Sequence, residues 1–288
     1  MSRLLFTIPV TSTHRFTLYC QATSYDTPED HKPPWPLPTS SSTPTTPVPV
    51  RCATNPPKPF PTLLTHPGAH RAHIALAELN LPYEEEIIDL SVPRTEAYLA
   101  INPRGLVPSL SYNGEIITES GVVAQFLADA HPSHLVPVPK DAPSALRRAR
   151  ISFFVDTFVS KLIPLNTEIS LASATELPGL VSKFTETVAK ELEPLLQDAS
   201  PFFGGSEKLT LAEVQTGSFA IRLLTLPALG VYPEAITAEL PQRAPAFWKW
   251  AQATAAHPSV KDRYDAEKMA PRLKEILAKR RAEKEAQK

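Results

Sequence analysis

From residue 61 onward the apolar positions change their period several times, and each change predicts a different element. Residues 62–66 (TLLTH) form a short β-rich run that ends in the turn signal His66-Pro67-Gly68. Between Ala69 and Leu79 the apolar residues recur at helical spacing, and residues 84–90 (EEEIIDL) are typical of a second strand. A strand, a helix and a strand in this order predict a β-α-β unit with a right-handed crossover.

A hairpin is the clearest local pattern of the chain. Residues 107–112 and 115–118 flank Asn113-Gly114, a dipeptide that suits both left-handed positions of a type I′ turn. Residues 94–100 predict a short helix ahead of the hairpin, and Glu119-Ser120-Gly121 opens a longer helix behind it. The elements of this region therefore follow the order β-α-β-α-β-β-α.

Strand patterns stop beyond this region. Helical spacing or helix-forming composition continues in five stretches, namely 144–170, 180–198, 210–224, 234–256 and 265–286. Thr210 and Glu213 stand three apart at a helix start, where each side chain can satisfy the other's free backbone N–H, so we interpret them as a structural capping box. The predicted domains are residues 61–137, mixed α/β, and residues 138–288, all-helical.

The first sixty residues have a different composition. They are rich in Pro, Ser and Thr, which predicts a disordered extension over residues 1–60. Residues 1–25 hold Arg3 and Arg15 and no acidic residue, a composition that transit peptides share. Two alternatives follow: a cytoplasmic protein with an untargeted extension, or a mitochondrial protein in which residues 1–58 act as a transit peptide.

Charge and cysteine content narrow the chemistry. Lys and Arg total 29 against 30 Asp and Glu, so no global field attracts nucleic acid or an anionic membrane. No apolar run approaches the roughly 18 to 20 residues that cross a bilayer. Cys20 and Cys52 both lie in the predicted extension, so the predicted folded part has no disulfide, no thiolate-bound metal and no cysteine nucleophile. A small molecule or a protein is the expected partner.

Two passages carry a family resemblance. The first is His66-Pro67-Gly68-Ala69-His70-Arg71 at a strand-to-helix junction, and the second is residues 102–110 (NPRGLVPSL) followed by Glu119-Ser120. Together they resemble the glutathione transferase superfamily, nearest its omega-like and fungal branches. The resemblance implies a thioredoxin-like N-terminal domain, an all-helical C-terminal domain, a homodimer, and glutathione as substrate or cosubstrate.

Glutathione is an extended anionic tripeptide, so its site needs strand-like backbone pairing and charge partners at both ends. If the Val107-Pro108 bond is cis, the N–H and C=O of Val107 turn outward to a ligand; the alternative is a trans proline that opens an edge strand. Ser120 stands in the first turn of a helix, where unpaired N–H groups attract an anion, although a plain helix cap is the alternative. The resemblance implies that Ser120 binds the γ-glutamyl carboxylate, that Glu119 faces the α-amino group or holds the turn, and that Arg94 faces the glycine carboxylate.

The group that activates the sulfur is the point at which the chain departs from the family pattern. Where the resemblance implies a Cys or a Ser before the proline, the chain has His66, and Thr65 supplies the adjacent hydroxyl. We therefore predict His66 and Thr65 as the catalytic candidates. A helix N-terminus disfavours a protonated imidazole, so His66 is expected to act as a neutral donor.

His66 cannot form a mixed disulfide, so the expected reaction is conjugation, in which the glutathione thiolate attacks a small electrophile in fungal secondary metabolism or detoxification. A glutathione-dependent isomerase or reductive enzyme is an alternative, and a non-catalytic scaffold or interaction module of the same fold is a rival from another class. By spacing, His66, His70 and His73 can share a helix face, but a zinc site there lacks a fourth ligand, so no metal is predicted.

Overall fold

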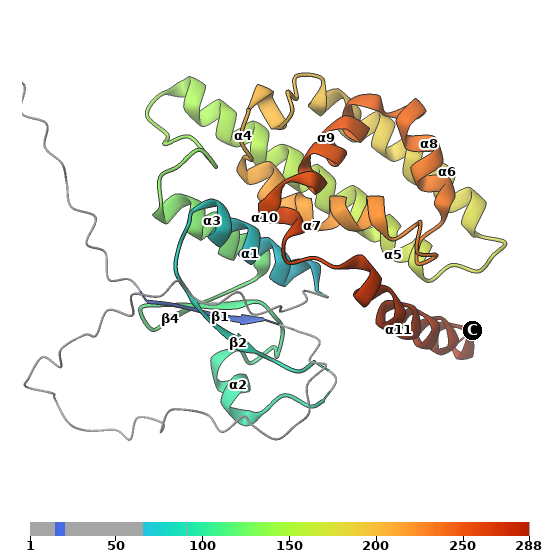
Figure 1. Cartoon of the computed structure of the whole chain (residues 1–288), viewed down its shortest axis with the longest axis horizontal. Coiled ribbons are helices and arrows are strands. Elements are labelled where there is room, and N and C mark those ends of the chain that lie inside the picture. The colour runs from blue at the N-terminus through green and yellow to red at the C-terminus, as the bar shows by residue number, and fades with distance from the viewer. Residues whose placement is uncertain (1–14, 21–65, 91, 288) are drawn as a thin grey trace, which may run out of the picture.

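The computed structural model describes residues 15–20, 66–90 and 92–287 of the chain. They form a small β-sheet with helices on both faces, joined to a larger layer of helices (Figure 1). The predicted fold class, a thioredoxin-like domain followed by an all-helical domain, is confirmed.

The sheet has the strand order β2-β1-β3-β4. Its strands are β1 (Phe16–Cys20), β2 (Glu84–Ile87), β3 (Ser109–Tyr112) and β4 (Glu115–Thr118). β1 runs parallel to β2, with Leu18 opposite Glu85, and antiparallel to β3, with Leu18 opposite Leu110. Alternate residues of a strand face the same side of a sheet, and Phe16, Leu18 and Cys20 are accordingly the buried residues of β1.

The position of β1 corrects the sequence interpretation. Residues 16–20 lie within the predicted disordered extension 1–60, yet they form a strand that pairs on both sides. The prediction of disorder is therefore wrong for residues 16–20. The predicted domain boundary at residue 61 is wrong as well, because it leaves β1 outside the α/β domain to which this strand belongs. The physical reason is that five residues with strand alternation are enough to fill the central place of a sheet, whatever the composition around them. The predicted first strand, residues 62–66, lies outside the described residues except for His66.

Three helices cover the sheet. α1 (Pro67–Glu78) and α3 (Ser120–Ala130) lie on the face that meets the helical domain, and α2 (Glu96–Ile101) lies on the opposite face (Figure 1). The hairpin of β3 and β4 turns at Asn113 and Gly114 with φ of 52° and 91°, so the predicted left-handed turn positions are confirmed.

The C-terminal domain consists of helices among the residues that the structure describes beyond 137. They are α4 (Ala142–Thr157), a π-helical turn (Phe158–Leu162), α5 (Ile163–Ser170), α6 (Leu177–Thr187), a second π-helical turn (Val188–Leu192), 3₁₀ turns at Glu193–Leu196 and Phe203–Gly205, α7 (Leu211–Thr225), α8 (Glu234–Arg243), α9 (Pro245–Ala256), α10 (Pro258–Lys261) and α11 (Ala266–Ala286). The predicted stretch 234–256 is divided at Pro245, which begins α9. None of the described helices has the length and apolar character to cross a membrane.

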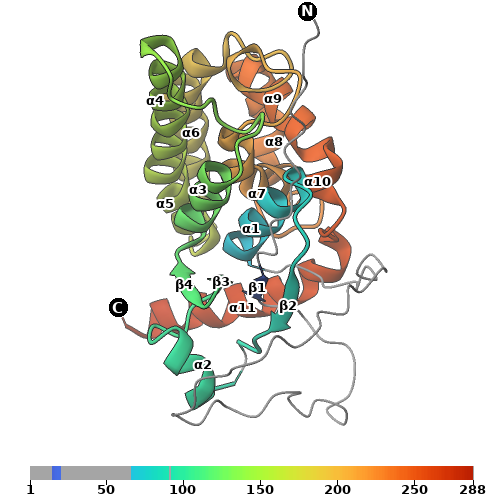
Figure 2. The same ribbon diagram turned by 90° about the vertical axis from the view of Figure 1, so that its left-hand side faces the viewer.

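One helix of the C-terminal domain, α7, packs against both domains. α7 packs against α1 and α3 of the first domain and against α4 and α9 of the second (Figure 2). Most of its residues are buried. Large aromatic side chains fill the core around it, including Phe154, Phe158, Phe247 and Trp250. The domains therefore share a packed interface, which fixes α1 and α3 against the helical layer.

Candidate functional site

A cavity of about 180 Å³ opens beside the N-terminal ends of α1 and α3 and the start of β3. Its lining residues are His66, Leu90, Arg94, Asn102, Gly105, Leu106, Val107, Pro108, Glu119 and Ser120. Six of the seven predicted site residues are in this set. The seventh, Thr65, lies outside the described residues. The structure thus brings together chain segments that the sequence analysis selected separately.

The backbone at Val107 has the geometry that the sequence analysis predicted. The Val107–Pro108 peptide bond is cis. Among the described residues, no hydrogen bond reaches the N–H or the C=O of Val107. The residue before it is fixed by side chains: the Tyr98 hydroxyl and the Asn102 amide both donate to the Leu106 carbonyl, at 2.6 and 2.9 Å. Val107 therefore presents unused backbone groups from a fixed loop that lines the cavity.

The start of α3 is open. Glu119 occupies the N-cap position with φ of 67°, a left-handed value that is uncommon for a residue other than glycine, and its side chain makes no capping bond. The first N–H groups of a helix have no acceptor within the helix. The Glu119 carboxylate instead pairs with Arg104, and both side chains are more than half exposed. Ser120 and the free N–H groups behind it thus form a positive helix end next to the cavity.

A buried arginine stands behind Ser120. Arg71 of α1 donates from Nη1 to the Ser120 Oγ at 3.3 Å and from Nε to the Gln215 carbonyl of α7 at 2.6 Å. Its guanidinium lies 4.7 Å from the ring centre of Phe219, and burial lowers its pKa to about 10, so it is protonated at neutral pH. Sequence reasoning missed this role, because its partners Ser120, Gln215 and Phe219 lie far away along the chain. The available signal was a charged residue within the predicted apolar helix 69–79.

His66 caps α1. Its Nδ1 accepts a hydrogen bond from the Gly68 N–H at 3.1 Å, so this nitrogen is unprotonated and the neutral ring carries its proton on Nε2. Desolvation, followed by the charges of Arg222 and Arg71, lowers the pKa of His66 below its usual 6.5. The ring is therefore neutral at physiological pH.

Arg94 is held by main-chain oxygens. It donates to the carbonyls of Gly105 at 3.0 Å, Asp89 at 2.9 Å, Val92 at 2.5 Å and Leu90 at 3.4 Å. These bonds tie Asp89, Leu90 and Val92 to the loop before Val107. The side chain therefore shapes the wall of the cavity, in addition to placing a positive charge there.

Comparison with known proteins agrees with this geometry. The family model described as "Glutathione S-transferase, N-terminal domain" matches residues 67–130. A probable maleylacetoacetate isomerase of Caenorhabditis elegans is 31% identical over 150 residues, which are 50% of this chain and 68% of that protein. A glutathione S-transferase-like protein of Aspergillus terreus is 35% identical over 91 residues, 31% of this chain and 40% of its own length.

Solved structures extend the comparison beyond the first domain. Rice GST1, crystallised in complex with glutathione, superposes with a TM-score of 0.65 at 25% identity, over 75% of this chain and 94% of the rice chain. Glutathione transferase Omega 2C of Trametes versicolor has a TM-score of 0.63 at 25% identity, over 92% of this chain and 99% of its own.

The chain belongs to the glutathione S-transferase superfamily.

The three histidines at the start of α1 each have partners of their own. His66 faces Gly68, and His70 lies 2.8 Å from the Val260 carbonyl and 3.1 Å from Arg222 Nη1. His73 meets Tyr83 and Glu85. The helical domain contacts His70 and His73 alike, through Arg222 and Arg263, and the prediction that the three rings can share one face stays a prediction. The premise that both cysteines lie outside the folded part is wrong, since Cys20 ends the buried strand β1.

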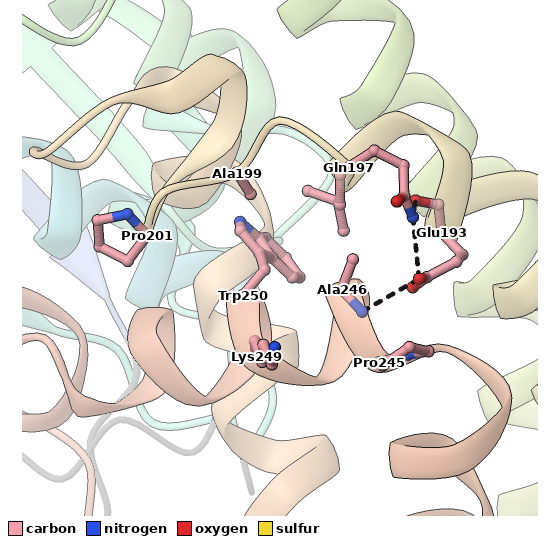
Figure 3. A pocket seen from close by; sticks show the side chains of 9 residues that line it. Glu193, Gln197, Ala199, Pro201, Pro245, Ala246, Lys249 and Trp250 are labelled. Atoms are coloured by element: carbon pink, nitrogen blue, oxygen red, sulfur yellow. Dashed lines mark hydrogen bonds between the residues drawn. The ribbon is translucent and has the colours of Figure 1, made fainter.

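A larger cavity, of about 450 Å³, lies within the helical domain (Figure 3). Its acidic residue, Glu193, has both carboxylate oxygens engaged: Ala246 and Phe247 donate their backbone N–H groups at 3.1 and 2.8 Å. Gln197 donates to the same carboxylate at 3.0 Å. Glu193 thus caps the start of α9. The carboxylate of this cavity is engaged in capping a helix, whereas the smaller cavity is lined by backbone groups without partners among the described residues.

Proposed function

We propose that the chain binds glutathione in the cavity at Val107 and Ser120 and catalyses attack of its thiolate on a small electrophile. The observation that carries the proposal is the open arrangement of the cavity: free backbone groups at Val107, an uncapped helix start at Ser120 and a neutral imidazole at His66. An extended peptide pairs with the first, a carboxylate suits the second, and a thiolate accepts a hydrogen bond from the third.

The two ends of the tripeptide have different partners in this proposal. The γ-glutamyl carboxylate lies at Ser120, and the Arg71 guanidinium behind Ser120 adds a positive charge. Glu119 stands next to the α-amino group. Arg94 attracts the glycine carboxylate by its charge and acts mainly by positioning the loop, because its N–H groups already hold four carbonyl oxygens.

His66 and Thr65 are the proposed activating groups. The Nε2–H of a neutral His66 stabilises the glutathione thiolate, whose proton leaves to solvent. The sulfur lone pair then forms the bond to the electrophilic carbon, and the leaving group departs with its electron pair. The N-terminal end of α1 favours the same negative charge. Each unit by which these groups lower the thiol pKa corresponds to about 1.36 kcal/mol.

Titration calorimetry with glutathione and an S-alkyl analogue, together with thiolate absorbance and turnover of an aryl halide, tests this proposal. His66→Ala and Thr65→Val are the test variants, and His134→Gln, outside the cavity, is the control. Loss of thiolate absorbance in one test variant identifies the activating group; no change in either removes both from the mechanism. Binding of glutathione without turnover in the wild type supports the scaffold interpretation instead.

Glutathione-dependent isomerisation is the second candidate, and one specific observation favours it. Proteins named as maleylacetoacetate isomerases appear among the relatives, one from Caenorhabditis elegans and one from Dictyostelium discoideum. Isomerisation regenerates glutathione, whereas conjugation consumes it. Counting free thiol before and after turnover of a cis-unsaturated diketo acid therefore separates the two reactions. A place in fungal secondary metabolism or detoxification remains part of the proposal and fits either reaction.

We further propose a homodimer and a cytoplasmic location. Large apolar side chains are exposed on β4, α3 and α4, namely Ile116, Val122, Leu146 and Phe153. A second copy of the chain covers such a surface, and Phe153→Glu is expected to shift the sedimentation coefficient to that of a monomer.

The position of β1 bears on the proposed location. Removal of residues 1–58 would delete β1 from between β2 and β3. This favours retention of the segment over the mitochondrial alternative, and mass spectrometry of the native N-terminus tests it.

A further inference from the structure

A second cluster of reactive side chains lies outside the glutathione cavity. It consists of Cys20 from β1, His73 from α1 and Glu85 from β2. Their potential ligand atoms all lie within 4.8 Å of one another. The Cys20 Sγ is 2.8 Å from Glu85 Oε1, and the His73 Nε2 is 3.1 Å from the same oxygen. None of the three lines the cavity, and the proposed reaction uses none of them.

The orientation of His73 is informative. The residue is only 2% exposed. Nδ1 is held by the Tyr83 hydroxyl at 2.9 Å and by Arg263 Nη1 at 3.1 Å. Nε2 points into the cluster, but among the described residues it has no partner with hydrogen-bond geometry. Because Arg263 can only donate, Nδ1 accepts in this ion-free arrangement and Nε2 carries the ring proton. A metal-bound histidine has the reverse arrangement, with its outer N–H donated to an acceptor, and the Tyr83 oxygen is the acceptor next to Nδ1.

The charges of the cluster also suit a dication. Without one, the Cys20 thiol donates to Glu85, whose second oxygen lies 3.1 Å from Arg263. A divalent cation that replaces the thiol proton balances one thiolate and one carboxylate. Arg263, with 31% of its side chain exposed, can remain as the outer partner of Glu85. Tetrahedral zinc would place Sγ and Oε1 about 3.5 Å apart and Nε2 and Oε1 about 3.3 Å apart, so these two pairs need to separate by roughly 0.7 and 0.2 Å.

We propose that Cys20, His73 and Glu85 form a binding site for Zn²⁺. On binding, the Cys20 thiol releases its proton to solvent, and bonds form from the ion to Sγ, Nε2 and Oε1. The His73 proton moves to Nδ1 and is donated to the Tyr83 oxygen, while Arg263 leaves Nδ1 and keeps Glu85 Oε2. No electron is transferred. The fourth position is filled by water on the side of Glu85, which is 14% exposed.

The choice of ion follows from the donor atoms. A thiolate and an imidazole favour zinc over magnesium or calcium, which prefer oxygen ligands. The ion would join β1 to β2 and to α1. It would therefore fix the central strand to the helix that carries His66 at its start.

Cobalt titration of the full chain tests the site directly. The protein is stripped with a chelator and titrated with Co²⁺, whose bond to a thiolate gives a charge-transfer absorption in the near ultraviolet. We expect one equivalent to produce this absorption and Zn²⁺ to abolish it. Cys20→Ser removes it, and Cys52→Ser, which changes the other cysteine, retains it.

His73→Gln provides an independent variant in case Cys20→Ser does not fold, which circular dichroism will show. It is expected to weaken Co²⁺ binding at least about tenfold and to remove the rise in melting temperature that Zn²⁺ gives the wild type. Absence of the absorption in the folded wild type overturns the proposal. So does an absorption that depends on Cys52, and the cluster is then an ion-free contact among β1, α1 and β2.

Discussion

The helix starts of α3 and α7 differ in how their free N–H groups are satisfied. At α7, Glu213 is fully buried and accepts from the backbone of Phe203 and Thr210, from the Thr210 hydroxyl and from the Trp250 indole, at 2.6–2.8 Å. At α3, Glu119 makes no capping bond, and the helix opens next to a cavity. A satisfied start stabilises the fold, whereas an unsatisfied one is available to a ligand.

The largest expected effect is on the satisfied start. Glu213→Ala leaves four buried donors without their acceptor, so we expect a loss of roughly 3 kcal/mol or more in the free energy of unfolding. Urea denaturation measures it, and Glu207→Ala, an exposed neighbour, is the control with no more than about 0.5 kcal/mol. A small effect of Glu213→Ala would contradict the assignment of this network as a main support of the helical domain.

At the start of α3, a substitution is expected to change glutathione affinity more than the free energy of unfolding. Ser120→Ala is expected to weaken glutathione about tenfold or more, because a hydrogen bond to a charged carboxylate contributes roughly 1.5–3 kcal/mol. Its free energy of unfolding should fall by no more than about 1 kcal/mol, since the Ser120 side chain caps no N–H group and its loss removes only the long 3.3 Å hydrogen bond from Arg71. Calorimetry and urea denaturation of the same sample separate the two quantities. Equal losses in both would show that Ser120 is an ordinary structural residue.

Thr210→Ala is the matched hydroxyl deletion at α7. The Thr210 Oγ1 accepts from the Ala212 N–H at 3.1 Å and donates to Glu213. We expect a loss of about 1–2 kcal/mol in stability with unchanged glutathione affinity, and Thr210→Ser should recover most of it. A change in glutathione affinity without a change in stability would contradict the assignment of the α7 start as structural.

The sequence predicted local features well and long-range ones poorly. The Asn113-Gly114 turn, the Thr210–Glu213 box and the start of α3 each depend on residues within a few positions of one another. β1 was missed because its five residues precede the proline-rich stretch 28–61 and were grouped with it, and because its support comes from pairing with Glu85 and Leu110. Arg71 was missed for the same reason, since its partners come from α3 and α7. Periodicity reports which face is buried, but it does not identify what covers that face.

The start of α1 combines features of the other two and gives the smallest expected effect. His66 caps the helix through Nδ1 and also lines the cavity. The pKa of His66 is lowered in the folded chain, so below its unfolded value of about 6.5 the unfolded chain binds more protons. The cap therefore contributes stability above pH 6.5 and loses it as the pH falls through the lower, folded pKa.

His66→Asn keeps a capping oxygen that does not titrate. The difference in unfolding free energy between wild type and His66→Asn should shift with pH by no more than about 1 kcal/mol between pH 7.5 and 5, with the wild type losing stability toward acid. Chemical denaturation at several pH values measures this difference, and His70 and His73 contribute equally to both proteins. A difference that stays constant over this range would mean that the imidazole cap does not titrate with folding, and His66 would then resemble the permanent cap of α7 more than the open start of α3.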